Sequence, residues 1–501
     1  MTTIRLSEKK VSTDIVVVGL ATQSSGTRKN DVVIESGELS LNTTSLLATL
    51  AKMGARGAVD EVVKIPDTDG RLLVFTGLGK VLPLYSNETL RRAAGAAARA
   101  LRGNIEATFS LPAKSVVDCG AIAEGALLGS YIYTEFRSTT KNDVKAPLKL
   151  IEILNSRVTK PEVKRAITRA EIIAKNVHVV RDFVNAPANH LNPEKFALRF
   201  KKLASAVGLK VTIYSDTQLK SQGFGGITSV GQGSASKPRL LHVSYQPKTK
   251  KSSHRLALVG KGITFDTGGY ALKPREGMVT MKCDMSGAAT VIATAIAIAE
   301  LKLPIEIDAW AALAENMVSD TATRPSDIIT MYGGKTVEVL NPDAEGRLVL
   351  GDALVKAAEV GKKRGGLTGI VDVATLTGAQ SIALGTRTAA IMTNNEEFQN
   401  VFLRAINRSG EAFWPMPLPE DLRPSLDSPV ADIANIGDRM GGMLVAGLFL
   451  KEFVEPDLPW LHLDIAGPAF NSGKEFGYTP EGGTGMSLAS LVALAEEIVH
   501  S

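Results

Sequence analysis

The chain has 501 residues, of which 44% are hydrophobic and 22% are charged, and its net charge is a mild +5. One hydrophobic core seldom supports this length, so two domains are expected, and the composition excludes a disordered chain. Two cysteines cannot build a disulfide framework, which favours a reducing, cytoplasmic setting.

Residues 1–158 alternate short β-branched runs with helical runs, which predicts an N-terminal α/β domain. The apolar run Ile15–Ala21 follows Asp14 directly and is better explained as a first strand than as a signal segment. The expected strands are Ile15–Leu20, Leu72–Thr76, Ala107–Leu111 and Leu148–Leu154, and the expected helices lie near Glu88–Leu101 and Ala121–Tyr131. No motif in this domain points to chemistry, so its predicted role is structural.

A long linker helix is predicted over residues 159–184, between the two domains. Thr159-Lys-Pro-Glu162 is a capping box with proline in the first turn, and apolar residues keep a helical spacing from Val163 to Val184. About 24 residues at a rise of 1.5 Å each give a rod of roughly 36 Å. The turn Asn185-Ala-Pro187 closes this helix.

Residues 185–501 return to strand–helix alternation and form the second predicted α/β domain. Several of its strands are apolar throughout, which predicts a central, mostly parallel or mixed sheet flanked by helices. The expected strands are Lys210–Tyr214, Leu240–Tyr245, Leu256–Val259, Ile305–Leu313, Val337–Leu340, Leu367–Val373 and Ala389–Met392. The longest apolar stretch, Ala288–Ala299, is too short to span a bilayer and predicts a buried, alanine-rich helix, so no membrane segment is expected.

The segment Asn341-Pro-Asp-Ala-Glu-Gly-Arg-Leu348 places two carboxylates and a guanidinium where a predicted strand passes into a helix. In open α/β sheets ligands bind there, beyond the carboxyl ends of the strands. Asp343 is expected to cap the new helix, and Glu345 to lie in its first turn, where the helix dipole favours anions. The segment alone fits a capped helix with a surface ion pair equally well.

More charged residues lie in or beside glycine-rich strand ends upstream, namely Lys261, Asp266, Lys273 and Asp284. Glycines at such positions let the backbone turn tightly and approach a ligand closely. Four carboxylates in one place would raise one another's pKa unless cations were present. A pair of divalent metal ions about 3.5–4 Å apart resolves that conflict, and oxygen ligands suit zinc, manganese or magnesium.

Several rival motifs are missing from the sequence. It contains no HExxH, no CxxC, no GxSxG and no GxxxxGK[ST], and its six histidines are scattered. These absences leave hydrolysis by two metal ions without histidine ligands as the favoured chemistry.

The octapeptide resembles the signature of the leucine aminopeptidase (cytosol aminopeptidase) family, Asn-Thr-Asp-Ala-Glu-Gly-Arg-Leu, at seven of its eight positions. The similarity extends from about residue 160 to the C-terminus. Other family-like segments are Asn185-Ala-Pro-Ala-Asn189, Thr375-Leu-Thr-Gly378 and Trp460-Leu-His-Leu-Asp-Ile-Ala-Gly467. The resemblance implies a dimetal-dependent aminopeptidase that removes N-terminal residues from peptides.

Five metal ligands are implied by the resemblance, namely Lys261, Asp266, Asp284, Asp343 and Glu345. Asp266 and Glu345 would bridge two divalent ions, manganese or zinc, while Lys261 and Asp284 complete the shell of one ion and Asp343 that of the other. A lysine ligates a metal only when neutral, so Lys261 would have to lose its proton far below its free pKa of about 10.4.

Two catalytic residues, Lys273 and Arg347, are implied as well. Lys273 would stay protonated and hydrogen-bond the scissile carbonyl oxygen, stabilising the oxyanion as it forms. Arg347 would hold a bicarbonate-type anion that serves as a proton shuttle. Taken alone, Lys273 could equally be a surface lysine, and Arg347 could equally be the ion-pair partner of Glu345.

The implied pocket for the N-terminal side chain consists of Met281, Thr375, Gly378 and Ala466, with Ala469 at its edge. Some relatives carry methionine where Ala469 stands, so a roomier pocket and a preference for large apolar residues such as leucine are expected. Met281 could equally be part of the core.

Pro342 departs from the family's threonine. Proline favours an extended Asn341, which is compatible with a helix start that follows, so we expect the metal ligands to keep their positions. Proline also removes a backbone N–H, and the loss of that hydrogen bond could at most weaken the binding of the metal held by Asp343.

The resemblance further implies a homohexamer of two stacked trimers whose active sites face an interior cavity, which would confine substrates to short peptides. Two rivals remain: a DNA-binding or recombination accessory role, as in some bacterial relatives, and a catalytically inactive scaffold. The densest basic runs, residues 248–251 and 362–364, are not interleaved with aromatic residues, which disfavours nucleic-acid binding.

Overall fold

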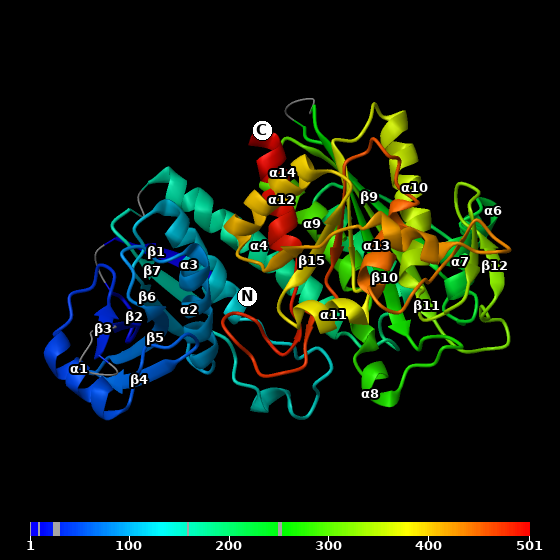
Figure 1. Cartoon of the computed structure of the whole chain (residues 1–501). Coiled ribbons are helices and arrows are strands. Elements are labelled where there is room, and N and C mark those ends of the chain that lie inside the picture. The colour runs from blue at the N-terminus through cyan, green and yellow to red at the C-terminus, as the bar shows by residue number, and fades with distance from the viewer. Residues whose placement is uncertain (1, 9–10, 24–30, 158–159, 249–252, 501) are drawn as a thin grey trace. The chain divides into compact units, whose positions relative to one another are not determined.

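The computed structural model describes residues 2–8, 11–23, 31–157, 160–248 and 253–500. The chain forms two compact units (Figure 1). Unit 1 contains residues 1–178 and 472–481, and unit 2 contains residues 179–471 and 482–501. The predicted division into 1–158, 159–184 and 185–501 stays a prediction about domains, because these units are defined by spatial compactness alone.

Unit 1 is built on a mixed sheet with the strand order β1-β7-β6-β2-β5-β4, and β3 pairs with β2. The predicted strands correspond to β2, β5, β6 and β7, and the predicted helices to α2 and α3, whereas β1, β3, β4 and α1 were not predicted. The elements are β1 (Thr3–Ser7), β2 (Ile15–Gln23), β3 (Asp31–Glu35), α1 (Thr43–Lys52), β4 (Val62–Pro66), β5 (Leu72–Lys80), α2 (Asn87–Ala100), β6 (Glu106–Ser110), α3 (Val116–Gly129) and β7 (Leu150–Leu154).

A segment from late in the chain, residues 472–481, completes unit 1. Arg102 pairs through both terminal nitrogens with the carboxylate of Glu475, at 2.9 and 2.7 Å. Arg99 Nε donates to the carbonyl of Gly477 (2.8 Å). A Cβ added to Gly95 would lie 2.5 Å from the Cβ of Tyr478, so α2 accepts this segment only because position 95 has no side chain.

The predicted long helix is α4 (Pro161–Asn185), with 25 residues. The residues predicted to form its apolar stripe are all buried, among them Val163, Ile167 and Val184. The predicted capping residue Thr159 lies outside the described residues.

Unit 2 contains an eight-stranded sheet with the order β16-β15-β18-β14-β10-β11-β9-β8. The central strands β11, β10, β14 and β18 are parallel, while β9, β8 and β15 join antiparallel, so the sheet is mixed. Its strands are β8 (Lys210–Tyr214), β9 (Arg239–Tyr245), β10 (Arg255–Asp266), β11 (Glu306–Asn316), β14 (Gly369–Ala374), β15 (Ala389–Thr393), β16 (Phe413–Pro415) and β18 (Trp460–Asp464). The predicted fold class, two α/β units with a mixed sheet flanked by helices, is confirmed.

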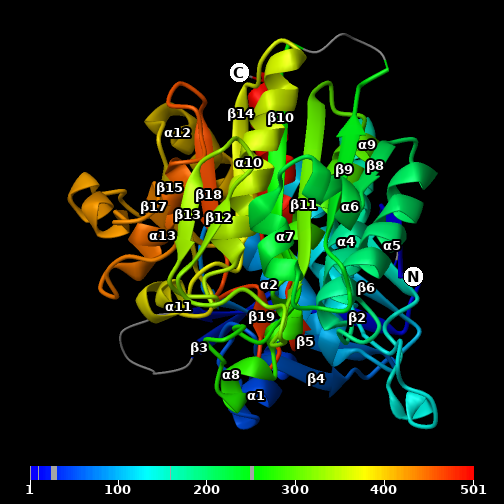
Figure 2. The ribbon, with the colours of Figure 1, turned by 90° about the vertical axis from the view of Figure 1, so that its right-hand side faces the viewer.

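Short strands and helices surround this sheet (Figure 2). A small sheet has the order β12-β13-β17, with β12 (Asp327–Thr330), β13 (Thr336–Val339) and β17 (Ile433–Ala434). The helices are α5 (Pro193–Ala206), α6 (Asp216–Ser221), α7 (Gly225–Gly231), α8 (Arg275–Met278), α9 (Ser286–Leu301), α10 (Gly346–Lys363), α11 (Gly378–Leu384), α12 (Glu396–Ser409), α13 (Gly442–Lys451) and α14 (Leu488–His500).

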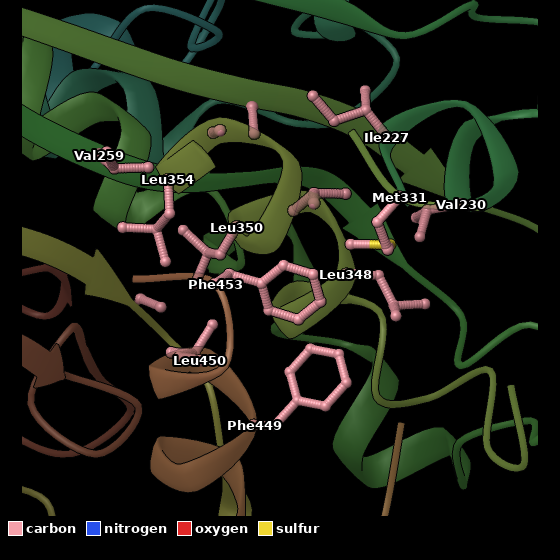
Figure 3. Close-up of a cluster of buried hydrophobic side chains, with 14 of the residues drawn as sticks. Ile227, Val230, Val259, Met331, Leu348, Leu350, Leu354, Phe449, Leu450 and Phe453 are labelled. Carbon is pink, nitrogen blue, oxygen red and sulfur yellow. The ribbon is translucent and has the colours of Figure 1, made fainter. Parts of the chain in front are cut away.

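Helices α9 and α10 cover opposite faces of β10. On one face, a Cβ added to Gly260 would lie 2.5 Å from Cα of Ala288 in α9, so strand and helix are in close contact. On the other face, Val259 joins Leu350 and Leu354 of α10 in a buried apolar cluster (Figure 3). The prediction of a buried, alanine-rich helix is confirmed by α9. The stretch 281–301 is long and apolar enough to cross a membrane, but 83% of its most apolar part is buried inside the protein.

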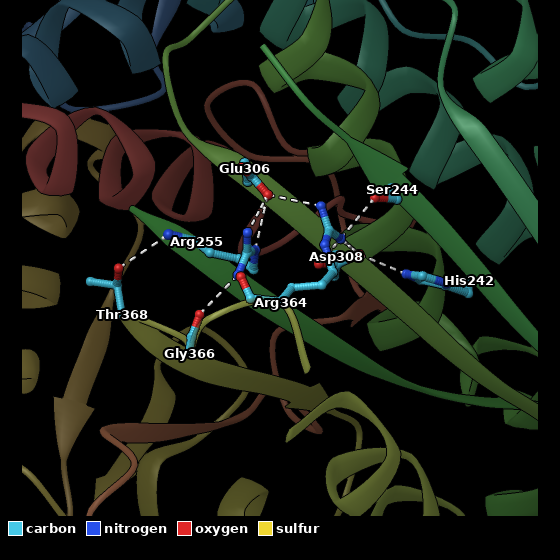
Figure 4. Close-up of polar contacts among 8 residues, drawn as sticks. All are labelled: His242, Ser244, Arg255, Glu306, Asp308, Arg364, Gly366 and Thr368. Atoms are coloured by element: carbon cyan, nitrogen blue, oxygen red, sulfur yellow. Dashed lines mark hydrogen bonds and ion pairs between the residues drawn. The ribbon is translucent and has the colours of Figure 1, made fainter. Parts of the chain in front are cut away.

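At the end of the sheet where β10 and β11 begin, a partly buried ionic network joins five side chains (Figure 4). Glu306 accepts from Arg255 (2.7 Å) and from Arg364 (2.8 Å). Asp308 accepts from Arg364 (2.7 Å) and lies 2.8 Å from the Nε2 atom of His242. Burial by itself would raise the pKa of Asp308, but hydrogen bonding to His242 and the charge of Arg364 lower it overall.

We expect Arg364→Ala to lower the free energy of unfolding at neutral pH by about 2–3 kcal/mol, because it removes a cation from two buried carboxylates. Urea unfolding measures this. The control is Arg404→Ala, which removes an arginine with a 55% exposed side chain and should cost under about 1 kcal/mol. In the wild type the contribution of Asp308, whose folded pKa is lowered, should be complete at neutral pH and be lost as the pH falls below about 4. Equal losses in the two variants would contradict this account.

Candidate metal centre

Strand β10 supplies the first two charged residues of the predicted site. Lys261 lies on the same face of β10 as Val259 and Ile263, towards α10, and Asp266 is the last residue of the strand. Both side chains are buried. The apolar strand β10 therefore places a lysine in the protein interior and ends at an aspartate. This is expected for a ligand site at the carboxyl end of a sheet.

The octapeptide connects β13 to α10, but the helix begins later than predicted. It starts at Gly346 with Glu345 as its N-cap residue, and no side chain caps it. The prediction that Asp343 caps the helix is therefore wrong. The reason is that the Asp343 carboxylate pairs with a lysine ammonium group instead of the first helical N–H groups.

Lys261 joins three segments that are far apart in the sequence. Its Nζ atom lies 2.9 Å from Asp284 Oδ1 and 2.7 Å from Glu345 Oε1, and it donates to the carbonyl of Thr375 (2.9 Å). Thr375 Oγ1 also donates to Asp284 Oδ1 (2.7 Å). A Cβ on Gly346 would come within 2.7 Å of the Lys261 side chain, so glycine at this position makes the approach possible.

Lys273 joins the other half of the cluster. Its Nζ atom lies 2.9 Å from Asp266 Oδ2 and 2.5 Å from Asp343 Oδ1. Oxygen atoms of Asp266, Asp343 and Glu345 all lie within 4.8 Å of one another. The structure therefore brings together all six of the predicted acidic and lysine residues.

The charges in this cluster do not cancel. Four carboxylates face two ammonium groups, which leaves a formal excess of two negative charges. In the part of the chain that the structure describes, no hydrogen-bond donor reaches the buried Oδ2 of Asp284 or the buried Oε2 of Glu345. Buried anionic oxygens without donors are costly, so this donor set fits divalent cations.

The electrostatics of the acidic groups follow from burial and crowding. Burial raises the pKa of Asp266 to about 6, and the nearby charge of Glu345 adds to the rise. Burial also raises the pKa values of Asp284 and Asp343. Glu345 differs: burial would raise its pKa, but the charges of the two lysines lower it overall.

The two lysines are held as cations in this arrangement. Burial would lower the pKa of Lys261, but the charges of Asp284 and Glu345 raise it overall. For Lys273 the charge of Asp266 likewise outweighs burial and raises the pKa. Lys261 must be neutral to act as a metal ligand. It could lose its proton only if a bound cation replaced its positive charge beside Asp284 and Glu345.

Arg347 lies in the first turn of α10 and is buried. Its Nη1 donates to the carbonyl of Asn435 (2.8 Å), and the guanidinium lies 5.9 Å from the ring centre of Phe449. Burial lowers the pKa of Arg347 to about 10. Its Nε finds no hydrogen-bond partner among the described residues, which leaves a donor for an anion.

The predicted pocket residues lie on the loops that follow β14 and β18 and in the 3-10 turn before Asp284. Asp464 at the end of β18 accepts from Leu376 N and from Ala466 N, both at 3.1 Å, which ties the two loops together. A Cβ added to Gly378 would meet no atom within 4 Å, so the space beside it is open. Ala469 is buried, and Met281 opens the 3-10 turn Met281–Cys283.

Sequence reasoning missed two amides that contact this site. Asn316, the last residue of β11, donates from Nδ2 to Asp266 Oδ1 (2.9 Å) and to the carbonyl of Pro342 (3.0 Å). A polar residue at the end of a buried parallel strand was a signal that could have identified it. Asn435, which follows β17, gives no comparable signal in the sequence.

Both halves of the chain match models of one protein family. Residues 8–140 match the N-terminal domain of the cytosol aminopeptidase family, and residues 178–492 match its catalytic domain. A probable cytosol aminopeptidase of Streptomyces avermitilis is 47% identical over 514 residues, covering 99% of this chain and 98% of that protein. Another, of Streptomyces coelicolor, is 50% identical over 471 residues, covering 90% of each chain.

Two solved structures share the fold. The bottromycin maturation enzyme BotP in complex with Mn has a TM-score of 0.83 and 35% identity, covering 97% of this chain and 99% of that one. A mutant of tomato leucine aminopeptidase has a TM-score of 0.84 and 32% identity, covering 99% and 96%. Fold and similarities together define a peptidase, an enzyme that hydrolyses peptide bonds. The chain belongs to the cytosol aminopeptidase family, as its octapeptide predicted.

We expect Gly346→Ala to lower aminopeptidase kcat at least about tenfold, because the new Cβ would displace the Lys261 side chain by close contact. The matched control is Gly442→Ala: Gly442 also begins a helix, α13, but a Cβ there meets nothing within 4 Å. Steady-state kinetics of both variants, with circular dichroism to verify folding, measure the effect. A Gly346→Ala enzyme as active as Gly442→Ala would contradict the crowding argument.

Proposed function

We propose that this aminopeptidase depends on two divalent metal ions held by the charged cluster of unit 2. The observation that carries the proposal is the convergence of Asp266, Asp343 and Glu345 oxygens within 4.8 Å. Like charges seldom meet in a buried place unless a cation is bound between them. The cluster lies at strand ends, where α/β enzymes bind their ligands.

The proposed metal ligands are Lys261, Asp266, Asp284, Asp343 and Glu345, with Asp266 and Glu345 shared by both ions. The Asp284 and Glu345 oxygens that lack donors support this assignment. Divalent ions bound there would activate a water molecule and polarise the scissile carbonyl. Manganese and zinc both suit the ligands, and manganese gains support from the Mn complex of the related BotP.

Lys273 is the proposed oxyanion donor. Asp266 and Asp343 hold its ammonium group in place and raise its pKa, so it is charged at neutral pH. A charged donor fixed before the reaction stabilises the negative charge that develops on the carbonyl oxygen. Lys273 is 18% exposed, so its ammonium group is accessible to a bound peptide.

Arg347 is the proposed holder of a bicarbonate-type anion that relays a proton. A buried guanidinium with one nitrogen lacking a protein partner suits a small planar oxyanion, which it can bind through two parallel hydrogen bonds. The Asn435 carbonyl orients this guanidinium from the other side.

The proposed pocket for the N-terminal side chain consists of Met281, Thr375, Gly378 and Ala466, with the small residue Ala469 nearby. Small side chains and the open space at Gly378 leave room for a large apolar group, so leucine is the expected preference. The free α-amine of the substrate would serve as a further ligand, which explains why cleavage is confined to the N-terminal residue.

We also propose a cytoplasmic homohexamer that acts on short peptides. Several large apolar side chains near the site loops are exposed, including Leu272, Val279 and Ile382, and exposed apolar groups of this kind are typical of surfaces that contact other protein chains. The DNA-binding alternative stays a prediction that no feature of the charged cluster addresses.

Removal of metal tests the proposed function directly. We expect the purified chain to contain about two divalent ions, and chelation to lower hydrolysis of leucine p-nitroanilide at least about a hundredfold. Re-addition of manganese or zinc should restore the activity, whereas Glu345→Ala should stay inactive in either metal. Full activity in the chelated enzyme would refute the metal dependence, and near-normal turnover in Glu345→Ala would refute the bridging role.

We expect Lys273→Ala to lower kcat about a hundredfold or more while KM changes little, because the interaction strengthens as the oxyanion forms. The control is Lys335→Ala, which removes a lysine that pairs with Glu452 outside the cluster. Initial-rate kinetics on the metal-saturated enzymes give both constants. An unchanged kcat in Lys273→Ala would remove this residue from the mechanism.

A further inference from the structure

One buried side chain outside the charged cluster contacts much of the loop that carries Asp343 and Glu345. Asn435 is fully buried and directly follows β17, which pairs in parallel with β13. Its backbone N–H donates to the carbonyl of Glu338 in β13 (2.9 Å). Asn435 therefore lies where the ladder between the two strands ends and the loop begins.

The Asn435 amide continues the pairing where the backbone ladder stops. Its Oδ1 accepts from Leu340 N (2.9 Å) and Asn341 N (3.1 Å), and its Nδ2 donates to the carbonyl of Asn341 (2.7 Å). A longer contact joins Nδ2 to the carbonyl of Ala344 (3.4 Å). One side chain thus bonds four backbone groups of a five-residue stretch.

The rest of that stretch has other partners. Pro342 has no N–H, and its carbonyl accepts from Asn316. The N–H of Asp343 donates to Asn341 Oδ1 (2.8 Å). Since Asn435 also bonds the backbone of Asn341, this second contact depends on it indirectly.

We propose that Asn435 is a positioning residue that fixes Asp343 and Glu345 where they can act as ligands of two divalent cations; this inference rests on the proposed dimetal function. Between β13 and α10 the loop's own backbone contributes a turn bond, from Ala344 N to the carbonyl of Asn341 (3.1 Å), and the side-chain amides of Asn435 and Asn316 hold the backbone on either side of it. Groups that orient metal ligands typically change metal affinity 10–100-fold when they are removed. Asn435→Ala leaves the partly buried N–H groups of Leu340 and Asn341 without this acceptor, and the loop would move to solvate them.

The test is calorimetric titration of chelator-treated, full-length protein with Mn²⁺ alone. We expect Asn435→Ala to bind Mn²⁺ about 10–100-fold more weakly than the wild type. Hydrogen exchange of the Leu340 and Asn341 amides, measured without metal, should be faster in the variant. Both readouts are independent of peptide hydrolysis.

The matched control is Asp352→Asn. Asp352 is also fully buried in unit 2 and accepts two backbone N–H groups, from Ile227 (2.8 Å) and Tyr332 (2.7 Å). Among the described residues, neither of these bonds reaches the charged cluster. The amide cannot accept both bonds, so this variant should unfold at a lower temperature and bind Mn²⁺ as the wild type does. Equal weakening of Mn²⁺ binding in both variants would assign Asn435 to general stability and overturn the proposal.

Asn435→Asp covers the case in which the alanine variant does not fold. It keeps both acceptor contacts and loses the two donations from Nδ2, to the carbonyls of Asn341 and Ala344. Its added negative charge would by itself strengthen cation binding, so weaker Mn²⁺ binding would report a displaced loop. Tighter affinity in this variant, or wild-type affinity in Asn435→Ala, overturns the positioning role alone. A wild-type chain that binds no Mn²⁺ overturns the proposed function as well.

Discussion

Charge compensation in the centre of unit 2 is the constraint on which the rest of the structure depends. Lys261 and Lys273 each bond two carboxylates, and together they keep four acidic groups within a few ångströms of one another. The compensation is incomplete, so the cluster is folded and still attracts cations.

The sheet makes this compensation possible because its buried parallel strands end in polar or charged residues at the same edge. Asp266 and Asn316 end the neighbouring parallel strands β10 and β11, and Asp464 ends β18 two strands away. A side chain at the end of a strand is fixed by the whole strand behind it. The loops that lack such support, 340–345 and 375–378, are held by the amide of Asn435 and the carboxylate of Asp464.

The strands and the charged residues were predictable because the signals are local. Apolar runs mark β10 and β14, and glycines beside Lys261 and Asp266 mark the point where backbone and ligand meet. The start of α10 was predicted wrongly, because capping preference is a weak local tendency that an ion pair with Lys273 overrides. Asn435 and the long-range pairing of segment 472–481 with unit 1 were unpredictable, because only the tertiary fold gives those residues their partners.

The inclusion of residues 472–481 in unit 1 has a consequence for how the chain is made. On the ribosome, the first 178 residues emerge long before residues 472–481, which pack against Gly95 and pair with Arg102. Unit 1 can reach its final packing only after residues 472–481 have been synthesised. A fragment ending after α4 would lack Glu475, Gly477 and Tyr478, which are the partners of Arg102, Arg99 and Gly95 in the complete unit.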